Sequence, residues 1–115
     1  MKTKALFFAI VFSMVIRSNL AIADQAVSEW GRILWFETGW SADTMAVMLN
    51  VETVNPTNPS CNVLDAGYAL DPQDPGVRVH QAAIMGAFFS GKQVRIRAEG
   101  CVYGKPKIIA VAVKN

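Results

Sequence analysis

The sequence predicts a mainly β domain with a single helix, in the order strand, strand, strand, helix, strand, strand. Short stretches rich in aromatic and β-branched residues alternate with clusters of Gly, Pro, Asn and Asp, which is typical of strands joined by turns. One longer stretch, residues 75–91, repeats apolar residues at helical spacing instead. No internal repeat or low-complexity tract is present, so the chain is expected to form one domain.

The first two expected strands lie in the N-terminal half. Residues 30–38 are rich in tryptophan, phenylalanine and branched residues and stop at a turn that begins at Gly39. A second strand, expected over residues 44–53, alternates between two faces, one with Val47, Leu49 and Val51 and the other with Ala46, Met48 and Asn50. Two Asn-Pro pairs in residues 55–59 end this strand.

A short third strand is expected at residues 67–70, and a helix follows it. Asp74 is a good N-cap and Pro75 suits the first helical position, while Ser90-Gly91-Lys92 supplies a C-terminal stop. The expected apolar face of this helix consists of His80, Ile84 and Phe88, flanked by Val79, Ala83 and Phe89.

Two strands follow the helix. Residues 93–99 alternate strictly, with Val94, Ile96 and Ala98 on one face and Gln93, Arg95, Arg97 and Glu99 on the other. A turn at residues 100–106 leads to a last strand over residues 107–113. Five short strands with one helix between the third and the fourth have the order of an OB-fold, a small and partly open barrel.

The N-terminus has the three parts of a signal peptide. Two lysines precede an apolar run over residues 5–16, and an Ala-Ile-Ala cleavage site ends at Ala23. The apolar run is too short to anchor the chain across a bilayer, so the mature domain, residues 24–115, is expected to be secreted or periplasmic with no membrane span. Arg17 is unusual at its position and leaves an uncleaved N-terminal anchor open as the alternative.

Removal of the signal peptide changes the charge of the protein. The whole chain has 11 basic and 9 acidic residues, and the basic Lys2, Lys4 and Arg17 precede the cleavage site. The mature domain therefore has 11 − 3 = 8 basic residues against 9 acidic ones, a net charge of −1. This balance in an exported protein argues against a nucleic-acid partner, even though Arg95 and Arg97 share one strand face.

The charges are also divided unevenly along the mature chain. Residues 24–74 contain eight acids and one base, whereas residues 75–115 contain seven bases and one acid. Two explanations remain open. The two halves pair within one barrel, or an acidic edge of one subunit meets a basic edge of the next in a head-to-tail ring.

Cys61 and Cys101 both lie in the exported part, and an even cysteine count in an oxidising compartment predicts a disulfide. The bond would tie the loop before the helix to the last hairpin. Closing a loop of about 40 residues is worth about 4 kcal/mol in the chain-entropy model. Two free thiols are the alternative, and no metal site is expected because the cysteines are widely spaced and the only histidine, His80, is distant from both.

The sequence contains no set of residues that indicates catalysis or a cofactor. His80 lies on the apolar helix face, where a buried, hydrogen-bonded histidine is the more ordinary outcome than a catalytic base. Asp65, Asp71 and Asp74 are near one another but lack the spacing of a calcium loop. We therefore expect a protein that is not an enzyme.

Tryptophans suggest a binding site instead. Trp30 and Trp35 are expected to belong to the core, whereas Trp40 lies in a turn that also contains Ser41, Asp43 and Thr44. An indole beside hydroxyls and a carboxylate is able to stack on a sugar ring and to bind its hydroxyl groups. These four residues form the predicted glycan site, and a core or subunit-contact role for Trp40 is the alternative.

A family resemblance is carried by the C-terminal third of the chain. Residues 79–96, followed by Gly100-Cys101 and by residues 103–108, resemble the helix and last two strands of the B subunits of subtilase-cytotoxin-like and pertussis-like AB5 toxins. The N-terminal half matches these subunits only in strand order. The likeness includes the Ser-Gly-Lys sequence followed by an alternating strand, which is not a catalytic signature.

The resemblance implies a secreted OB-fold subunit that assembles as a homopentamer, binds glycans on its outer faces and works with a separate enzymatic A subunit. It also implies a glycan pocket with a serine near the first strands, for which Ser41 is the nearest candidate. The alternative function is a stand-alone periplasmic OB-fold protein that binds a small ligand or a protein partner.

Overall fold

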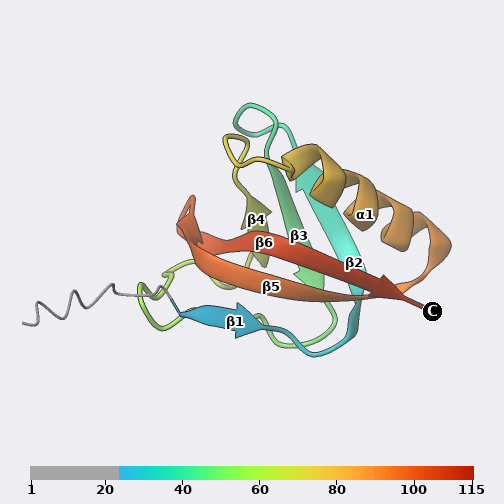
Figure 1. The fold of residues 1–115 in the computed structure, drawn as a ribbon, viewed down its shortest axis with the longest axis horizontal. Coiled ribbons are helices and arrows are strands. Elements are labelled where there is room, and N and C mark those ends of the chain that lie inside the picture. Colours follow the sequence, from blue (N-terminus) through green and yellow to red (C-terminus); the bar gives the residue numbers. More distant parts are fainter. Residues whose placement is uncertain (1–23) are drawn as a thin grey trace, which may run out of the picture.

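The computed structural model describes residues 24–115, and Figure 1 shows its ribbon. The predicted signal peptide, residues 1–23, lies outside the described residues. The fold is mainly β with one helix, and its elements in chain order are β1 (Gln25–Val27), β2 (Gly31–Thr38), β3 (Met45–Leu49), β4 (Tyr68–Leu70), α1 (Val77–Ser90), β5 (Gln93–Val102) and β6 (Lys105–Lys114).

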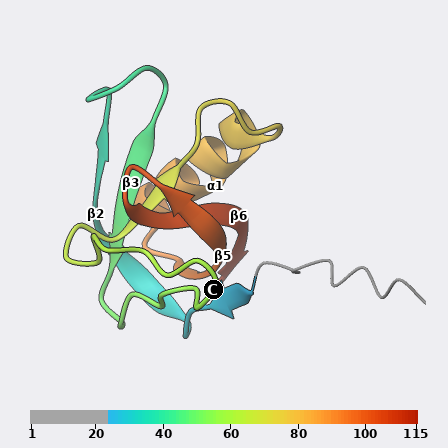
Figure 2. The same ribbon diagram turned by 90° about the vertical axis from the view of Figure 1, so that its left-hand side faces the viewer.

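Hydrogen bonds join five of these strands into a closed ring. β5 pairs with β2, β2 with β3, β3 with β4, β4 with β6, and β6 again with β5. All pairings are antiparallel except that of β4 with β6, in which Ala69 pairs with Lys107. Figure 1 shows β5 and β6 as a long pair, and Figure 2 shows β2 and β3 on one side of the molecule with β5 and β6 on the other.

The described residues contain six strands, one more than the sequence predicts, because β1 forms upstream of the expected first strand. β1 and β2 follow one another along the same edge of β5, β1 opposite residues 97–99 and β2 opposite residues 93–94. Ser28 lies in the break between them, where its backbone N–H donates to the carbonyl of Ile96 and its hydroxyl accepts from the N–H of Ile96, at 2.9 Å. The serine side chain thus replaces a backbone group in the ladder and interrupts what would otherwise be one strand.

The second predicted strand is shorter than expected. β3 ends at Leu49 because the next residue, Asn50, binds Arg32 partly through its side chain, whose Oδ1 accepts from the Arg32 N–H at 2.9 Å. The predicted difference between the two faces of this strand holds only in part, because residues on both faces are buried. Ala46 and Val47 point to opposite faces, and both are completely buried.

The predicted start of the helix is wrong, and its predicted end is confirmed. Asp74 does not cap α1. Pro75 and Gly76 instead occupy a tight turn closed by a hydrogen bond from the Val77 N–H to the Asp74 carbonyl, with Gly76 at φ 81° and ψ 2°. These angles are those of the third residue of a type II turn, which Pro-Gly favours. At the other end Gly91 adopts a left-handed conformation and terminates the helix as expected.

The face that α1 buries also differs from the prediction. Ile84 is buried as predicted, and Ala87, which was not part of the predicted face, is buried as well. His80 is only half-buried. Phe88 and Phe89 pack edge-to-face against Phe36 of β2 but remain exposed, Phe89 by 77% of its surface. The helix therefore covers the strand ring with small and branched residues and leaves most of Phe89 exposed to solvent.

The core lies inside the ring and under α1. Its buried members are Ile33, Met45, Val47, Leu49, Tyr68, Leu70, Ile84, Ala87, Val94, Ile96, Ala98 and Ile108. Tyr68 is the largest of them, and its hydroxyl accepts a hydrogen bond from the Val54 N–H at 2.8 Å. Burial raises the pKa of the Tyr68 phenol above its usual range, and the charge of Glu52 adds to the rise, while the bond from Val54 opposes it.

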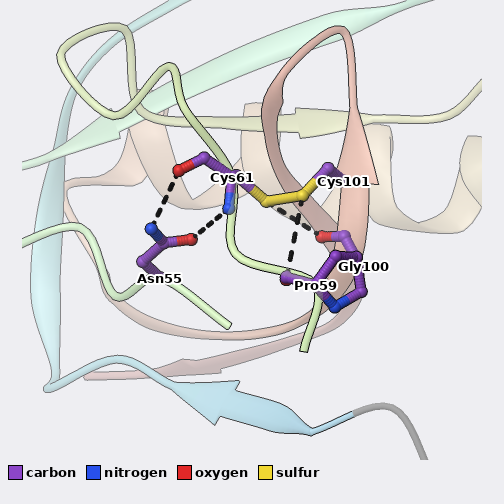
Figure 3. Close-up of a disulfide and its surroundings, with 5 residues drawn as sticks. All are labelled: Asn55, Pro59, Cys61, Gly100 and Cys101. Carbon is purple, nitrogen blue, oxygen red and sulfur yellow. Dashed lines mark hydrogen bonds between the residues drawn. A yellow bond between two sulfur atoms is a disulfide. The ribbon is translucent and has the colours of Figure 1, made fainter. Parts of the chain in front are cut away.

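The predicted disulfide between Cys61 and Cys101 is confirmed, with the two Cα atoms 5.7 Å apart (Figure 3). Cys101 lies within β5 rather than after it, opposite Pro106 of β6. Asn55 fixes the other half of the bond, since its side chain accepts from the Cys61 N–H at 2.7 Å and donates to the Cys61 carbonyl at 2.9 Å. The disulfide therefore fastens the loop before β4 to the turn end of the β5–β6 hairpin.

Candidate functional site

A groove with two arginines lies on the outer face of β5. The predicted alternation of this strand is confirmed, because Val94, Ile96 and Ala98 are buried while Arg95 and Arg97 are exposed. The two guanidinium groups therefore start from neighbouring positions on one face of the sheet, about 7 Å apart along the strand. Such a pair is suited to one extended anionic group or to two anionic atoms of the same ligand.

Small residues leave space beside both arginines. On β6, Ala112 lies directly opposite Arg95 and Ala110 directly opposite Arg97, and on β1 Val27 lies opposite Arg97. A cavity of about 130 Å³ results, lined by Val27, Arg95, Arg97, Ala110, Val111 and Ala112. Its lining combines two cationic side chains with an apolar surface, a combination found in sites for small polar ligands.

Neighbouring side chains hold the two guanidinium groups in place. Arg95 lies over the ring of Trp30, 5.0 Å from its centroid, and the ammonium of Lys114 lies 4.2 Å from the same ring. Cation–π contact orients Arg95 and leaves its N–H donors free at their edges. Arg97 donates from Nη1 to the side-chain oxygen of Gln25 at 2.9 Å, so it also has a defined position.

Neither arginine has a carboxylate partner among residues 24–115. The ion pair formed by this part of the chain joins Lys107 to Asp74 at 3.4 Å, away from the groove. The nearest acid along β5 is Glu99, which accepts a hydrogen bond from the Gln25 amide at 3.2 Å. Arg95, Arg97 and Lys114 therefore form a cationic surface with one carboxylate at its end, and an anionic ligand would be attracted to it.

The four residues predicted to bind glycan do not form one surface. Thr44 is buried and donates its hydroxyl to the Leu70 carbonyl at 2.9 Å, so this hydroxyl is occupied inside the fold. Asp43 lines a cavity of about 270 Å³ between the β2–β3 loop and α1. Trp40 instead contacts the β5–β6 hairpin, and Ser41 is exposed, with its carbonyl accepting from the Thr44 N–H at 3.3 Å.

The cavity beside Asp43 has both polar and apolar walls. The side chain of Gln81 crosses from α1 and donates to the Asp43 backbone carbonyl at 2.7 Å, which closes one side. Besides these two residues, the lining consists of Thr38, Gly39, Ala42, Thr44, Met45 and Met85. The cavity is open to solvent and has no cationic group in its lining.

The arginine face can be recognised in the sequence, but the groove cannot. Arg95 and Arg97 stand out by their alternation with apolar residues, whereas the groove depends on the register that sets Ala112 and Ala110 opposite them. The alternating alanines in the last strand were the available signal. Val27 had none, because β1 is only three residues long and was not expected as a strand.

No family model, no curated protein and no solved structure matches the chain. Within residues 24–115, no helix has the length and apolar character needed to cross a membrane. The same residues contain no group of three His, Cys, Asp or Glu side chains arranged to hold a metal ion.

Proposed function

We propose that this chain is a non-enzymatic, exported OB-fold protein, similar to the glycan-binding, ring-forming B subunits of AB5 toxins, and that its arginine groove binds an acidic sugar. The observation that carries the proposal is the pair Arg95 and Arg97. Both guanidinium groups are exposed, positioned by neighbours and without a carboxylate partner in residues 24–115, and both face alanines across the ladder.

The OB-fold part of the proposal is supported by the order of strand pairings and by the place of the helix. If β1 and β2 are counted as one strand interrupted at Ser28, five strands remain. The single helix then falls between the third and the fourth, and the third and fifth run parallel. This is the strand order predicted for an OB-fold.

The chemistry of the groove favours a carboxylate-bearing sugar. A guanidinium group donates two parallel hydrogen bonds to a carboxylate, and charge-assisted bonds of this kind are the stronger ones in proteins. The apolar part of the lining, Val27 with Ala110 and Ala112, offers a surface for the C–H groups of the sugar ring. Ala110 and Ala112 leave room for the hydroxyl groups of the sugar, because an alanine side chain extends no further than Cβ.

Export and ring assembly are supported by separate features. The disulfide is expected in an oxidising compartment. Val79 and Phe89 of α1 are exposed by 70% and 77%, and apolar residues exposed together mark contact surfaces. In a pentameric ring of subunits, a second copy of this chain would cover the face of α1 that carries Val79 and Phe89. A separately encoded A chain would supply the enzymatic activity.

A stand-alone periplasmic binding protein is the second candidate function. The cavity of about 270 Å³ beside Asp43 and Gln81 favours it, because this cavity could admit a small ligand without any second subunit. Native mass measurement of residues 24–115 separates the two. The ring predicts five times the monomer mass, and a monomeric mass favours the stand-alone protein.

A glycan array tests the proposed ligand. The protein should be retained on glycans that end in a carboxylate-bearing sugar, and the Arg95→Ala/Arg97→Ala variant should lose at least about a hundredfold in affinity. Each charge-assisted bond contributes about 1.5–3 kcal/mol, and 1.4 kcal/mol is a factor of ten. Arg78→Ala removes an exposed charge from α1 and is the matched control. Unchanged retention of the double variant would contradict the proposal.

A further inference from the structure

Three side chains from two distant parts of the chain meet outside the arginine groove. Trp40 follows β2, while Tyr103 and Lys105 belong to the β5–β6 hairpin. The indole and phenol rings lie 5.7 Å apart between centroids with an angle of 73° between their planes. The ammonium of Lys105 lies 4.7 Å from the centroid of Trp40. Trp40 and Tyr103 nevertheless expose 39% and 42% of their surfaces.

Both segments that present this cluster are firmly anchored. The β2–β3 loop is closed by the hydrogen bond from the Gly39 N–H to the Thr44 carbonyl, and Thr44 is itself buried. The hairpin is held by the disulfide at Cys101 and by the bond of 2.9 Å from the Val63 N–H to the Gly104 carbonyl. The rings are therefore presented in a fixed arrangement, which lowers the entropy lost when a ligand binds.

The conformation of Tyr103 is unfavourable for its residue type. Tyr103 and Gly104 form the two-residue connection of the hairpin, and both have positive φ values, 53° and 74°. Asn-Gly is the preferred pair for such a turn, and a tyrosine with positive φ costs stability. Strained residues of this kind concentrate at functional sites. The phenol is thus kept beside Trp40 against the local preference of the backbone.

We propose that Trp40, Tyr103 and Lys105 form a second saccharide site that takes a neutral sugar ring. One aromatic ring stacks on the C–H face of the sugar, the other, at 73° to it, contacts the sugar's edge, and the ammonium of Lys105 donates hydrogen bonds to the hydroxyl groups. This proposal rests on the proposed function for the class of its ligand. It is distinct in place, because none of its three residues lines the arginine groove.

A variant that improves the turn while removing the ring gives a sharp test. Tyr103→Asn restores the preferred Asn-Gly pair, so its melting temperature should equal or exceed that of the parent protein. Its affinity for immobilised glucose- and galactose-terminated neutral oligosaccharides should fall at least about tenfold, because the substitution removes one of the two aromatic surfaces that contact the sugar. Trp40→Ala should show the same loss.

The Arg95→Ala/Arg97→Ala variant is the matched control, and it should retain the neutral oligosaccharides while losing the acidic ones. Retention of neutral oligosaccharides by Tyr103→Asn and Trp40→Ala overturns the second site and leaves the arginine groove untouched. If the parent protein binds neutral but not acidic sugars, the groove fails and the second site stands. If the parent protein retains no neutral oligosaccharide, the second site is overturned, whatever acidic glycans do.

Discussion

Loss of the Cys61–Cys101 disulfide should remove a large part of the stability of this domain. The two cysteines are 40 residues apart in sequence. Linking them lowers the entropy of the unfolded chain, and the chain-entropy relation gives about 4 kcal/mol for a loop of this length at 25 °C. Domains of this size are stable by about 5–15 kcal/mol, so the bond accounts for a quarter or more of the total. The Cys61→Ala/Cys101→Ala variant should therefore unfold at a much lower urea concentration.

Urea unfolding followed by circular dichroism measures this loss, and the reduced parent protein is the matched control because it keeps both sulfur atoms. Both forms should lose about 4 kcal/mol. Hydrogen exchange in the reduced protein should increase first in residues 61–66 and 101–106, where the bond fastens the loop to the hairpin. A loss below about 1 kcal/mol in both forms would refute the argument that the bond limits the unfolded chain.

Two further predictions concern the backbone and the core. Gly67→Ala should lower the free energy of unfolding by more than about 3 kcal/mol, because a Cβ there would overlap the Val47 carbonyl and the residue has φ 75°. Gly39→Ala, at φ 87° in open space, should lower it by only about 1–2 kcal/mol in thermal unfolding. Equal losses would contradict the steric argument. Tyr68 has a raised pKa in the fold, so the unfolded chain ionises first and stability should fall as the pH rises above about 10. Tyr68→Phe should lack this part of the decline, and an identical pH profile for the two proteins would show that the buried phenol is not its cause.

Much of the architecture follows from local patterns, and the failures have local causes. The strict alternation around Arg95 predicts a strand with one buried face, and Gly91 predicts a left-handed end of the helix; the structure contains both. The helix start failed because Pro75-Gly76 satisfies two motifs, the first turn of a helix and a type II turn, and the turn prevailed. In the turn, the carboxylate of Asp74 is free to pair with Lys107 across the fold, a contact that local sequence does not encode.

The candidate sites depend on tertiary contacts and were less predictable. Thr44 was expected to bind a ligand because it lies in a polar turn, but its hydroxyl completes the hydrogen bonding of a buried carbonyl. Trp35, which is expected in the core, is exposed by 38%, almost as much as Trp40 at 39%. The partners of Trp40, Tyr103 and Lys105, lie more than 60 positions away in sequence. The local sequence of the β2–β3 loop determines only the exposure of Trp40, while the closure of the strand ring determines its neighbours.

The central claim is that Arg95 and Arg97 bind the carboxylate of a sugar, and NMR titration with glucuronic acid tests it most directly. The Nε–H resonances of both arginines should shift with a common binding curve, accompanied by the indole N–H of Trp30, because Arg95 lies over that ring. Glucose, which lacks the carboxylate, should leave the arginine resonances unchanged. Arginine resonances that do not respond to glucuronic acid, or that respond equally to glucose, would contradict the account.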